Sequence, residues 1–279
     1  MKNCLCASLV VMLLVSVLAA ENASSVDDEA AKTKKWWREH YQQVGSEYKF
    51  YLKSHPDEPL TMKKEAVLKY AHPKDNMHGE MFVWTHGGRP QLIGSIWSYV
   101  PDGVRRSVVH EFQSFAREPL KPVEIGTATW APKIGNPSES IPSAKPPVAS
   151  KRLRLAQMRS IARQFTGFST PGGSRELELR MVPEPLFRFD NEKSYGAIFC
   201  FMNGWDPEIM LLVEAREEKS KSNWYFSAGR FNGTPLRLQY KGKDVWSVKH
   251  TKIDNPRFGD PEGTFYAVHH VERFDEPKR

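Results

Sequence analysis

The sequence predicts an α+β protein of two similar tandem units, each an N-terminal helix packed on an antiparallel sheet of four to six strands. Three observations support this fold class. Two segments carry apolar residues at helical spacing, and alternating or aromatic-rich runs typical of strands follow each of them. A proline-rich stretch then separates the two helix-then-strands segments. Two such units can pack as a pseudo-dimer, with a shared core or a cleft between them.

The first 20 residues have the pattern of a signal peptide. A basic start at Met1 and Lys2 precedes an apolar run that ends in small residues at Ala19 and Ala20. The run is too short to span a membrane, although retention as an N-terminal anchor is the alternative. We therefore expect an exported protein, periplasmic or extracellular, with no transmembrane segment after signal cleavage. Residues 21–35 are polar and Ala-rich, which predicts a flexible leader.

Residues 36–130 form the first predicted unit. Trp37, Tyr41, Val44 and Tyr48 recur at helical spacing and predict a helix over about residues 34–50. Strands are expected after it at residues 60–70, 80–84, 91–99, 108–115 and 122–130.

Residues 131–149 contain five prolines and no apolar period, which predicts a semi-rigid linker. The second predicted unit, residues 150–279, begins with a helix whose apolar stripe is Leu155, Met158, Ile161, Ala162 and Phe165. Strands are then expected at residues 176–181, 186–189, 197–202, 208–215, 224–231, 236–240, 245–248 and 264–274.

The two units align with each other along the sequence. At a shift of about 117 residues, Gly87 and Pro90 coincide with Gly204 and Pro207. Similar shifts place Gly126 and Trp130 on Gly242 and Trp246. Glycine and proline are fixed by turn geometry, so matches of this type favour an internal duplication. The alternative is that two unrelated hairpins share the same turn residues.

The aligned segments resemble an uncharacterised family of secreted planctomycete proteins. In the second unit the resemblance rests on the strings Arg159–Phe165, Leu177–Leu179, Pro185–Phe189, Gly196–Phe199 and Asp206–Arg216, and in the first on Phe82–Thr85, Gly88–Pro90 and His110–Ser114. It covers most of the mature chain. The resemblance implies export and a two-part layout, and it carries no activity.

No catalytic, metal or cofactor motif emerges from the sequence. Cys200 is the one cysteine after the signal peptide and lies in an apolar run, which is typical of a buried structural residue. His72, Asp75 and His78 lack the spacing of a zinc site, and His110-Glu111 is not part of a His-Glu-x-x-His motif because Ser114 follows. On a strand, His110 and Glu111 would point to opposite faces and could not work as a pair.

Two groups of residues are candidates for binding. Trp84 and Trp205 flank the two matched turns and could stack on a ligand, with His86 and Arg89 as polar neighbours and His110 facing a cleft. Lys151, Arg152, Arg154, Arg159 and Arg163 give the second helix a basic face that could contact an anionic surface. The formal net charge of +7 is mild. In an exported protein it favours an envelope polymer or another envelope protein over nucleic acid as the partner.

These patterns favour an exported, non-catalytic binding or structural protein of the periplasm or cell surface. One alternative is a hydrolase of an envelope polymer that uses carboxylates in a cleft between the two units. Another is a module for protein–protein assembly. The absence of catalytic motifs weighs against an enzyme, but paired carboxylates leave no recognisable spacing in a sequence.

Overall fold

The computed structural model describes residues 31–72, 76–173, 175–218 and 221–275. It is mostly β, with 53% strand and 13% helix. The chain divides between Val44 and Gly45 into two compact parts. The predicted signal peptide and most of the predicted leader lie outside the described residues.

A helix spans residues 31–47 and crosses the boundary between the two parts. Trp37, Tyr41 and Val44 of its predicted apolar stripe are buried. Tyr48 follows the end of the helix rather than extending it.

The second part of the chain, residues 45–279, contains an eight-stranded antiparallel sheet. Its strand order is β20-β21-β22-β7-β6-β5-β3, with β4 also paired to β5. Strands β20 to β22, near the C-terminal end of the chain, join this sheet through the pairing of β22 with β7. The strands are β3 (Thr61–Met62), β4 (Leu68–His72), β5 (Met77–His86), β6 (Arg89–Tyr99), β7 (Arg105–Ser114), β20 (Ile253–Asp254), β21 (Arg257–Gly259) and β22 (Phe265–Asp275).

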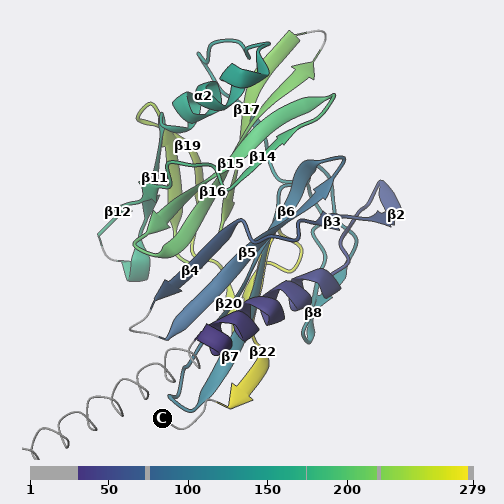
Figure 1. Ribbon diagram of the computed structural model, residues 1–279. Helices are drawn as coiled ribbons and strands as arrows, with labels where there is room; N and C mark the ends of the chain where they lie inside the picture. Colours follow the sequence, from purple (N-terminus) through teal and green to yellow (C-terminus); the bar gives the residue numbers. More distant parts are fainter. Residues whose placement is uncertain (1–30, 73–75, 174, 219–220, 276–279) are drawn as a thin grey trace, which may run out of the picture. The chain divides into compact units, whose positions relative to one another are not determined.

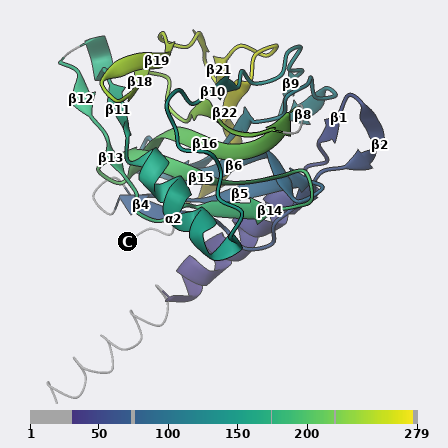
Figure 2. The ribbon, with the colours of Figure 1, turned by 90° about the horizontal axis from the view of Figure 1, so that it is seen from above.

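A six-stranded antiparallel sheet has the order β10-β17-β16-β15-β13, with β14 also paired to β15. Its strands are β10 (Glu139–Ser140), β13 (Arg180–Met181), β14 (Phe187–Asp190), β15 (Ser194–Asn203), β16 (Asp206–Glu218) and β17 (Lys221–Arg230). Figures 1 and 2 show its green strands β15 and β16 beside the blue strands β5 and β6 of the first sheet.

One face of the six-stranded sheet is covered by α2 (Lys151–Ala162) and by a four-stranded sheet of order β12-β11-β18-β19. The strands of the covering sheet are β11 (Phe165–Ser169), β12 (Leu177–Glu178), β18 (Leu236–Tyr240) and β19 (Lys243–Val248). A short 3-10 turn, η2 (Pro171–Gly173), follows β11. The remaining strands form two small hairpins: β1 (Tyr51–Leu52) with β2 (His55–Pro59), and β8 (Val123–Ile125) with β9 (Ala128–Trp130).

The two large sheets share a core. Alternate residues of β15, such as Ile198 and Cys200, pack in the same cluster as Met81, Val83 and Ile93 of the first sheet. The intervening residues of β15 point the other way, toward α2 and the four-stranded sheet. Because β15 and β16 bury both faces, their sequences read as continuous apolar runs.

The same pairing order occurs in both large sheets. Strands β3 and β4 pair with β5, which is followed by β6 and β7, and β13 to β17 repeat this order. The register also matches: His86 faces Arg89 across one turn, and Asn203 faces Asp206 across the other. Arg89 and Asp206 therefore occupy equivalent positions. A common origin of the sheets by duplication stays a prediction.

The predicted fold class is wrong, because the chain is mostly β and is not a pair of tandem helix-on-sheet units. Two non-local arrangements explain the difference. Strands β20 to β22 belong to the C-terminal half of the sequence but extend the eight-stranded sheet. The six-stranded sheet is covered by the four-stranded sheet as well as by α2. Neither arrangement has a signature in local sequence periodicity, which reports only which face of an element is apolar.

The proline-rich segment 131–149 is held against the rest of the protein. Its strand β10 pairs with β17, and Ile141 and Asn136 are buried. The side-chain amide of Asn136 donates a hydrogen bond to the carbonyl of Ala228 at 3.2 Å.

Candidate functional site

A pocket of about 320 Å³ brings together residues of both large sheets, and we call it the acidic aromatic pocket. Glu111 of β7 contributes one carboxyl group, and Asp206, the first residue of β16, contributes a second. The aromatic side chains that line the pocket are Tyr70, Trp97, Trp205, Phe231, Phe258 and Phe265.

A glycine explains how Tyr70 and Trp97 come to line the same pocket. Gly79 of β5 lies directly between Tyr70 of β4 and Trp97 of β6 in the sheet register. A Cβ atom at Gly79 would lie 2.4 Å from the Cβ of Trp97 and 2.8 Å from the Tyr70 ring. The missing side chain therefore lets both aromatic residues close over the strand. The Tyr70 hydroxyl is fixed by a 2.7 Å hydrogen bond with Ser95.

Trp205 reaches the pocket from the turn between β15 and β16. Gly204 has a φ of 61°, a conformation that favours glycine, and it allows the tight turn. The Trp205 ring lies 4.8 Å from His72 and 6.4 Å from Tyr70, measured between ring centroids. A residue of the second sheet thus packs on β4 of the first and closes one side of the pocket.

Both carboxyl groups of the pocket hold their protons unusually strongly. Burial raises the pKa of Glu111 to about 8, and the neighbouring Asp206 adds to the rise, while the Trp97 side chain opposes it. Burial, together with the nearby Glu208, raises the pKa of Asp206 to about 7. Glu111 and Asp206 therefore exchange protons near neutral pH, where acid–base chemistry or a charged ligand can use them.

Glu208 lies next to Asp206 but is differently placed. It is buried, and it accepts a 3.3 Å hydrogen bond from Ser169. Burial raises its pKa, whereas hydrogen bonds from Ser169, Asn232 and Asn203 and the charge of Arg230 lower it. Glu208 is thus a buried carboxyl group held by hydrogen bonds, and it does not line the pocket.

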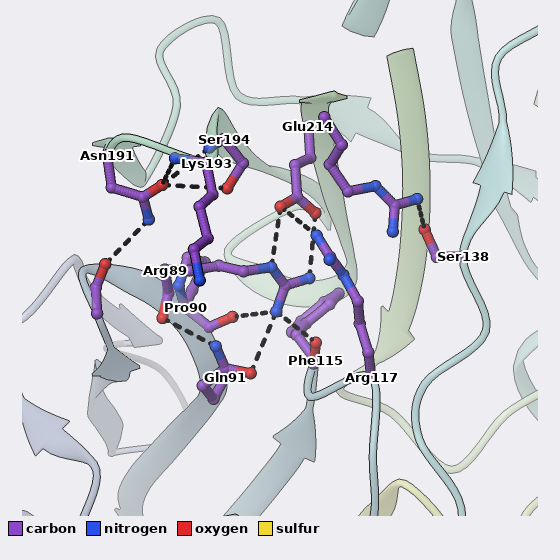
Figure 3. Close-up of polar contacts among 12 residues, drawn as sticks. Arg89, Pro90, Gln91, Phe115, Arg117, Ser138, Asn191, Lys193, Ser194 and Glu214 are labelled. Atoms are coloured by element: carbon purple, nitrogen blue, oxygen red, sulfur yellow. Dashed lines mark hydrogen bonds and ion pairs between the residues drawn. The ribbon is translucent and has the colours of Figure 1, made fainter. Parts of the chain in front are cut away.

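A second pocket surrounds Arg89, the residue equivalent to Asp206 in strand register. The Arg89 guanidinium holds Glu214 by two hydrogen bonds of 2.9 and 3.1 Å, and Arg117 donates a third at 2.6 Å (Figure 3). Burial alone would raise the pKa of Glu214, but these two guanidiniums outweigh it and lower the pKa. This carboxylate is fully neutralised by the protein itself.

The structure does not bring the predicted ligand-binding residues together. Trp205 lines the acidic aromatic pocket, whereas His86 and Arg89 line the second pocket. Trp84 is 0% exposed within an aromatic cluster, so it has no surface for stacking on a ligand. His110 is also buried, and its Nδ1 lies 2.6 Å from the Tyr48 hydroxyl.

The basic face of α2 is partly neutralised. Arg154 forms an ion pair with Asp190 at 2.7 Å and lies over the Tyr195 ring, and Arg159 forms an ion pair with Glu184. Lys151, Arg152 and Arg163 are exposed. Contact of this helix with an anionic surface therefore depends on these three residues.

The other sequence candidates are also placed. Asp75 lies outside the described residues, and His72 contacts Trp205. No group of three or more His, Cys, Asp or Glu residues is arranged to hold a metal in the part of the chain that the structure describes. Burial raises the pKa of the Cys200 thiol. Among the described helices, none is long and apolar enough to cross a membrane.

Comparisons with known proteins give no further guide. No family model, curated protein or solved structure matches the chain. The resemblance to secreted planctomycete proteins stays a prediction.

Sequence reasoning missed Glu111 and Asp206. It correctly placed His110 and Glu111 on opposite faces of a strand, but it followed only the histidine. Asp206 reads as an ordinary turn residue next to Gly204 and Trp205. The available signal was the repeat itself, since the alignment sets Asp206 against Arg89 and so reverses the charge at an equivalent position.

Proposed function

We propose that this protein is an exported ligand-binding protein whose binding site is the acidic aromatic pocket. One observation carries the proposal: two carboxyl groups from different sheets, Glu111 and Asp206, converge in a cavity with aromatic walls. Concave sites that combine apolar walls with a few convergent polar groups are the usual form of small-ligand sites. The signal-peptide pattern of residues 1–20 supports export.

The size and lining of the pocket indicate a small ligand. About 320 Å³ lies at the lower end of the range for small-molecule sites. Trp97 and Trp205 are half-buried, so part of each ring remains accessible from the cavity. A ligand would be held mainly by contact with aromatic surfaces and oriented by the two carboxyl groups.

A thermal-shift screen tests this proposal. The wild-type protein and two variants, Trp205→Ala and Trp246→Ala, are heated with sugars, wall fragments, nucleotides and amines. Trp246 is the matched control, because it is a half-buried tryptophan of β19 that packs against the core between the six-stranded and four-stranded sheets, and it does not line the pocket. A ligand that binds only the folded state raises the unfolding midpoint.

We expect at least one compound to raise the midpoint of the wild type and of Trp246→Ala, but not that of Trp205→Ala. A compound that stabilises all three proteins equally would bind elsewhere and contradict the assignment of the site. A screen in which no compound raises the midpoint would also contradict the proposal.

Hydrolysis is a second candidate function, favoured by the titration of the carboxyl pair near neutral pH. A protonated carboxyl beside an ionised one can act as general acid and base on a bound substrate. In that case Glu111→Gln should abolish the release of products from a polymer that still binds. Equal turnover by the wild type and Glu111→Gln would exclude this function.

A further inference from the structure

The two pockets differ in whether the protein neutralises its own carboxylates. In the second pocket, Arg89 and Arg117 surround Glu214, and both guanidiniums point at its carboxylate (Figure 3). The equivalent strand position in the acidic aromatic pocket carries Asp206 instead of an arginine. The same strand position therefore carries a cation in one pocket and a carboxyl group in the other.

No lysine or arginine is among the described residues that line the acidic aromatic pocket. His269 lines it, but burial and the neighbouring His270 lower its pKa to about 4, so it is neutral at physiological pH. Buried carboxylates are normally paired with a cation or a metal. Glu111 and Asp206 have no lysine or arginine as such a partner among the described residues that line the pocket, and the pKa values of both carboxyl groups are raised.

The walls of the pocket are suited to a positive charge. Aromatic faces attract cations through their ring quadrupoles, and the attraction is strongest where water is excluded. Trp97, Trp205 and Phe258 line the same cavity as the two carboxyl groups. The Trp97 side chain lies close enough to the Glu111 carboxyl group to favour its ionised form, so an aromatic wall and a carboxyl group of the pocket are direct neighbours.

We propose that the ligand of the acidic aromatic pocket is a small organic cation, an amine or a quaternary ammonium compound. Its charged group would lie between aromatic faces and beside the carboxyl groups of Glu111 and Asp206. The ligand would take the place that a guanidinium occupies in the second pocket. This inference rests on the proposed binding function and names the chemical class of its ligand.

Binding of a cation would be linked to release of protons. A positive charge favours the ionised form of Glu111 and Asp206, so both lower their pKa when the ligand binds. Affinity should therefore rise with pH between about 6 and 8, the range in which the two groups lose their protons in the empty pocket. The other titratable groups at the site among the described residues are Tyr70, Glu208, His250 and His269.

Calorimetry with charged and neutral isosteres tests the inference. Choline is compared with 3,3-dimethylbutan-1-ol, its neutral carbon analogue, and butylamine with butan-1-ol. The proteins are the wild type, Glu111→Gln, and Lys193→Ala as a control at the second pocket. Measurement in two buffers of different ionisation enthalpy reports the number of protons released.

We expect at least one cation to bind about tenfold or more tightly than its neutral analogue, because the aromatic faces and the two carboxyl groups attract the charge and not the neutral group. Proton release should accompany binding, and Glu111→Gln should reduce both the preference and the release, while Lys193→Ala leaves them unchanged. Equal binding of cation and analogue would overturn the inference but leave the binding function intact. The inference would also fail if neither cation binds while another compound of the thermal-shift screen does. Only failure of the whole screen would overturn the binding function as well.

Discussion

Replacing Glu111 by glutamine should stabilise the protein in a way that depends on pH. Burial and Asp206 raise the pKa of Glu111 from an ordinary value of 4.5 to about 8 in the folded protein. Below pH 4.5 the carboxyl is protonated in both the folded and the unfolded states, so its raised pKa costs no stability. As the pH rises from 4.5 to 8, the unfolded chain loses the proton more readily, and the free energy of unfolding falls. Above pH 8 the full penalty remains.

The size of the effect follows from the two pKa values. Their separation corresponds to an upper limit of ~5 kcal/mol at about 1.36 kcal/mol per pH unit. Glu111 keeps some accessible surface inside the pocket, and water that reaches it weakens the penalty. We therefore expect Glu111→Gln to be more stable than the wild type by about 2–4 kcal/mol near pH 9, and similar to it near pH 5.

Urea unfolding at the two pH values measures this difference. Glu178→Gln is the matched control, because Glu178 is an exposed glutamate of β12 and its replacement should change little at either pH. A stability difference between Glu111→Gln and the wild type that is the same at both pH values would refute the reasoning. A variant less stable than the wild type near pH 9 would refute it more strongly, since it would mean that the ionised carboxylate has a stabilising partner.

Three further predictions concern the rest of the fold. Arg89→Met should lower the free energy of unfolding by about 3–5 kcal/mol, because it leaves Glu214 buried with a single partner. The double variant Arg89→Met with Glu214→Leu should recover most of that stability, and a loss below about 1 kcal/mol in the single variant would contradict the prediction. Gly135→Ala should cost about 1–3 kcal/mol in urea unfolding, since its Cβ would lie 2.2 Å from backbone atoms of Arg117; an unchanged midpoint would mean that the proline-rich segment is not held there. Cys200 should resist a thiol reagent in the native protein and react on unfolding, because burial raises its pKa; rapid native reaction would contradict its placement.

Local patterns in the sequence predicted individual elements well. The hairpin of β5 and β6 turns at Gly87 and Gly88, whose φ values of 55° and 80° lie in the left-handed region that favours glycine. Met158 and Ile161 of the predicted apolar stripe are buried on α2. In both cases the local conformation or burial of a residue is determined by the residue itself and its neighbours within a few positions in the sequence.

The assembly of the elements could not be predicted in the same way. The pairing of β22 with β7 joins residues more than 150 positions apart, and nothing in either strand specifies the other as its partner. Trp84 and Trp205 flank equivalent turns, yet Trp84 is in the core and Trp205 at the pocket. Their exposure depends on what packs on each sheet, which local periodicity does not report.

The candidate site was out of reach for a related reason. Glu111 and Asp206 belong to different sheets, and only the face-to-face packing of those sheets brings them together. The possibility of carboxylates in a cleft between the two halves was visible in the sequence, but their identity was not. Acidic residues without a metal spacing or a catalytic motif look like ordinary surface residues until the fold is known.

The acidic aromatic pocket holds two carboxyl groups and no lysine or arginine among the described residues that line it. The most direct test is a carbon-13 NMR titration of the glutamate and aspartate carboxyl groups, assigned with Glu111→Gln and Asp206→Asn and recorded with and without choline and butylamine. We expect Glu111 to titrate near pH 8 and Asp206 near pH 7 in the empty protein, and both to titrate at lower pH when one of the amines is bound. Titration of both groups below about pH 5 in the empty protein would show that the pocket already neutralises them, and would contradict the account.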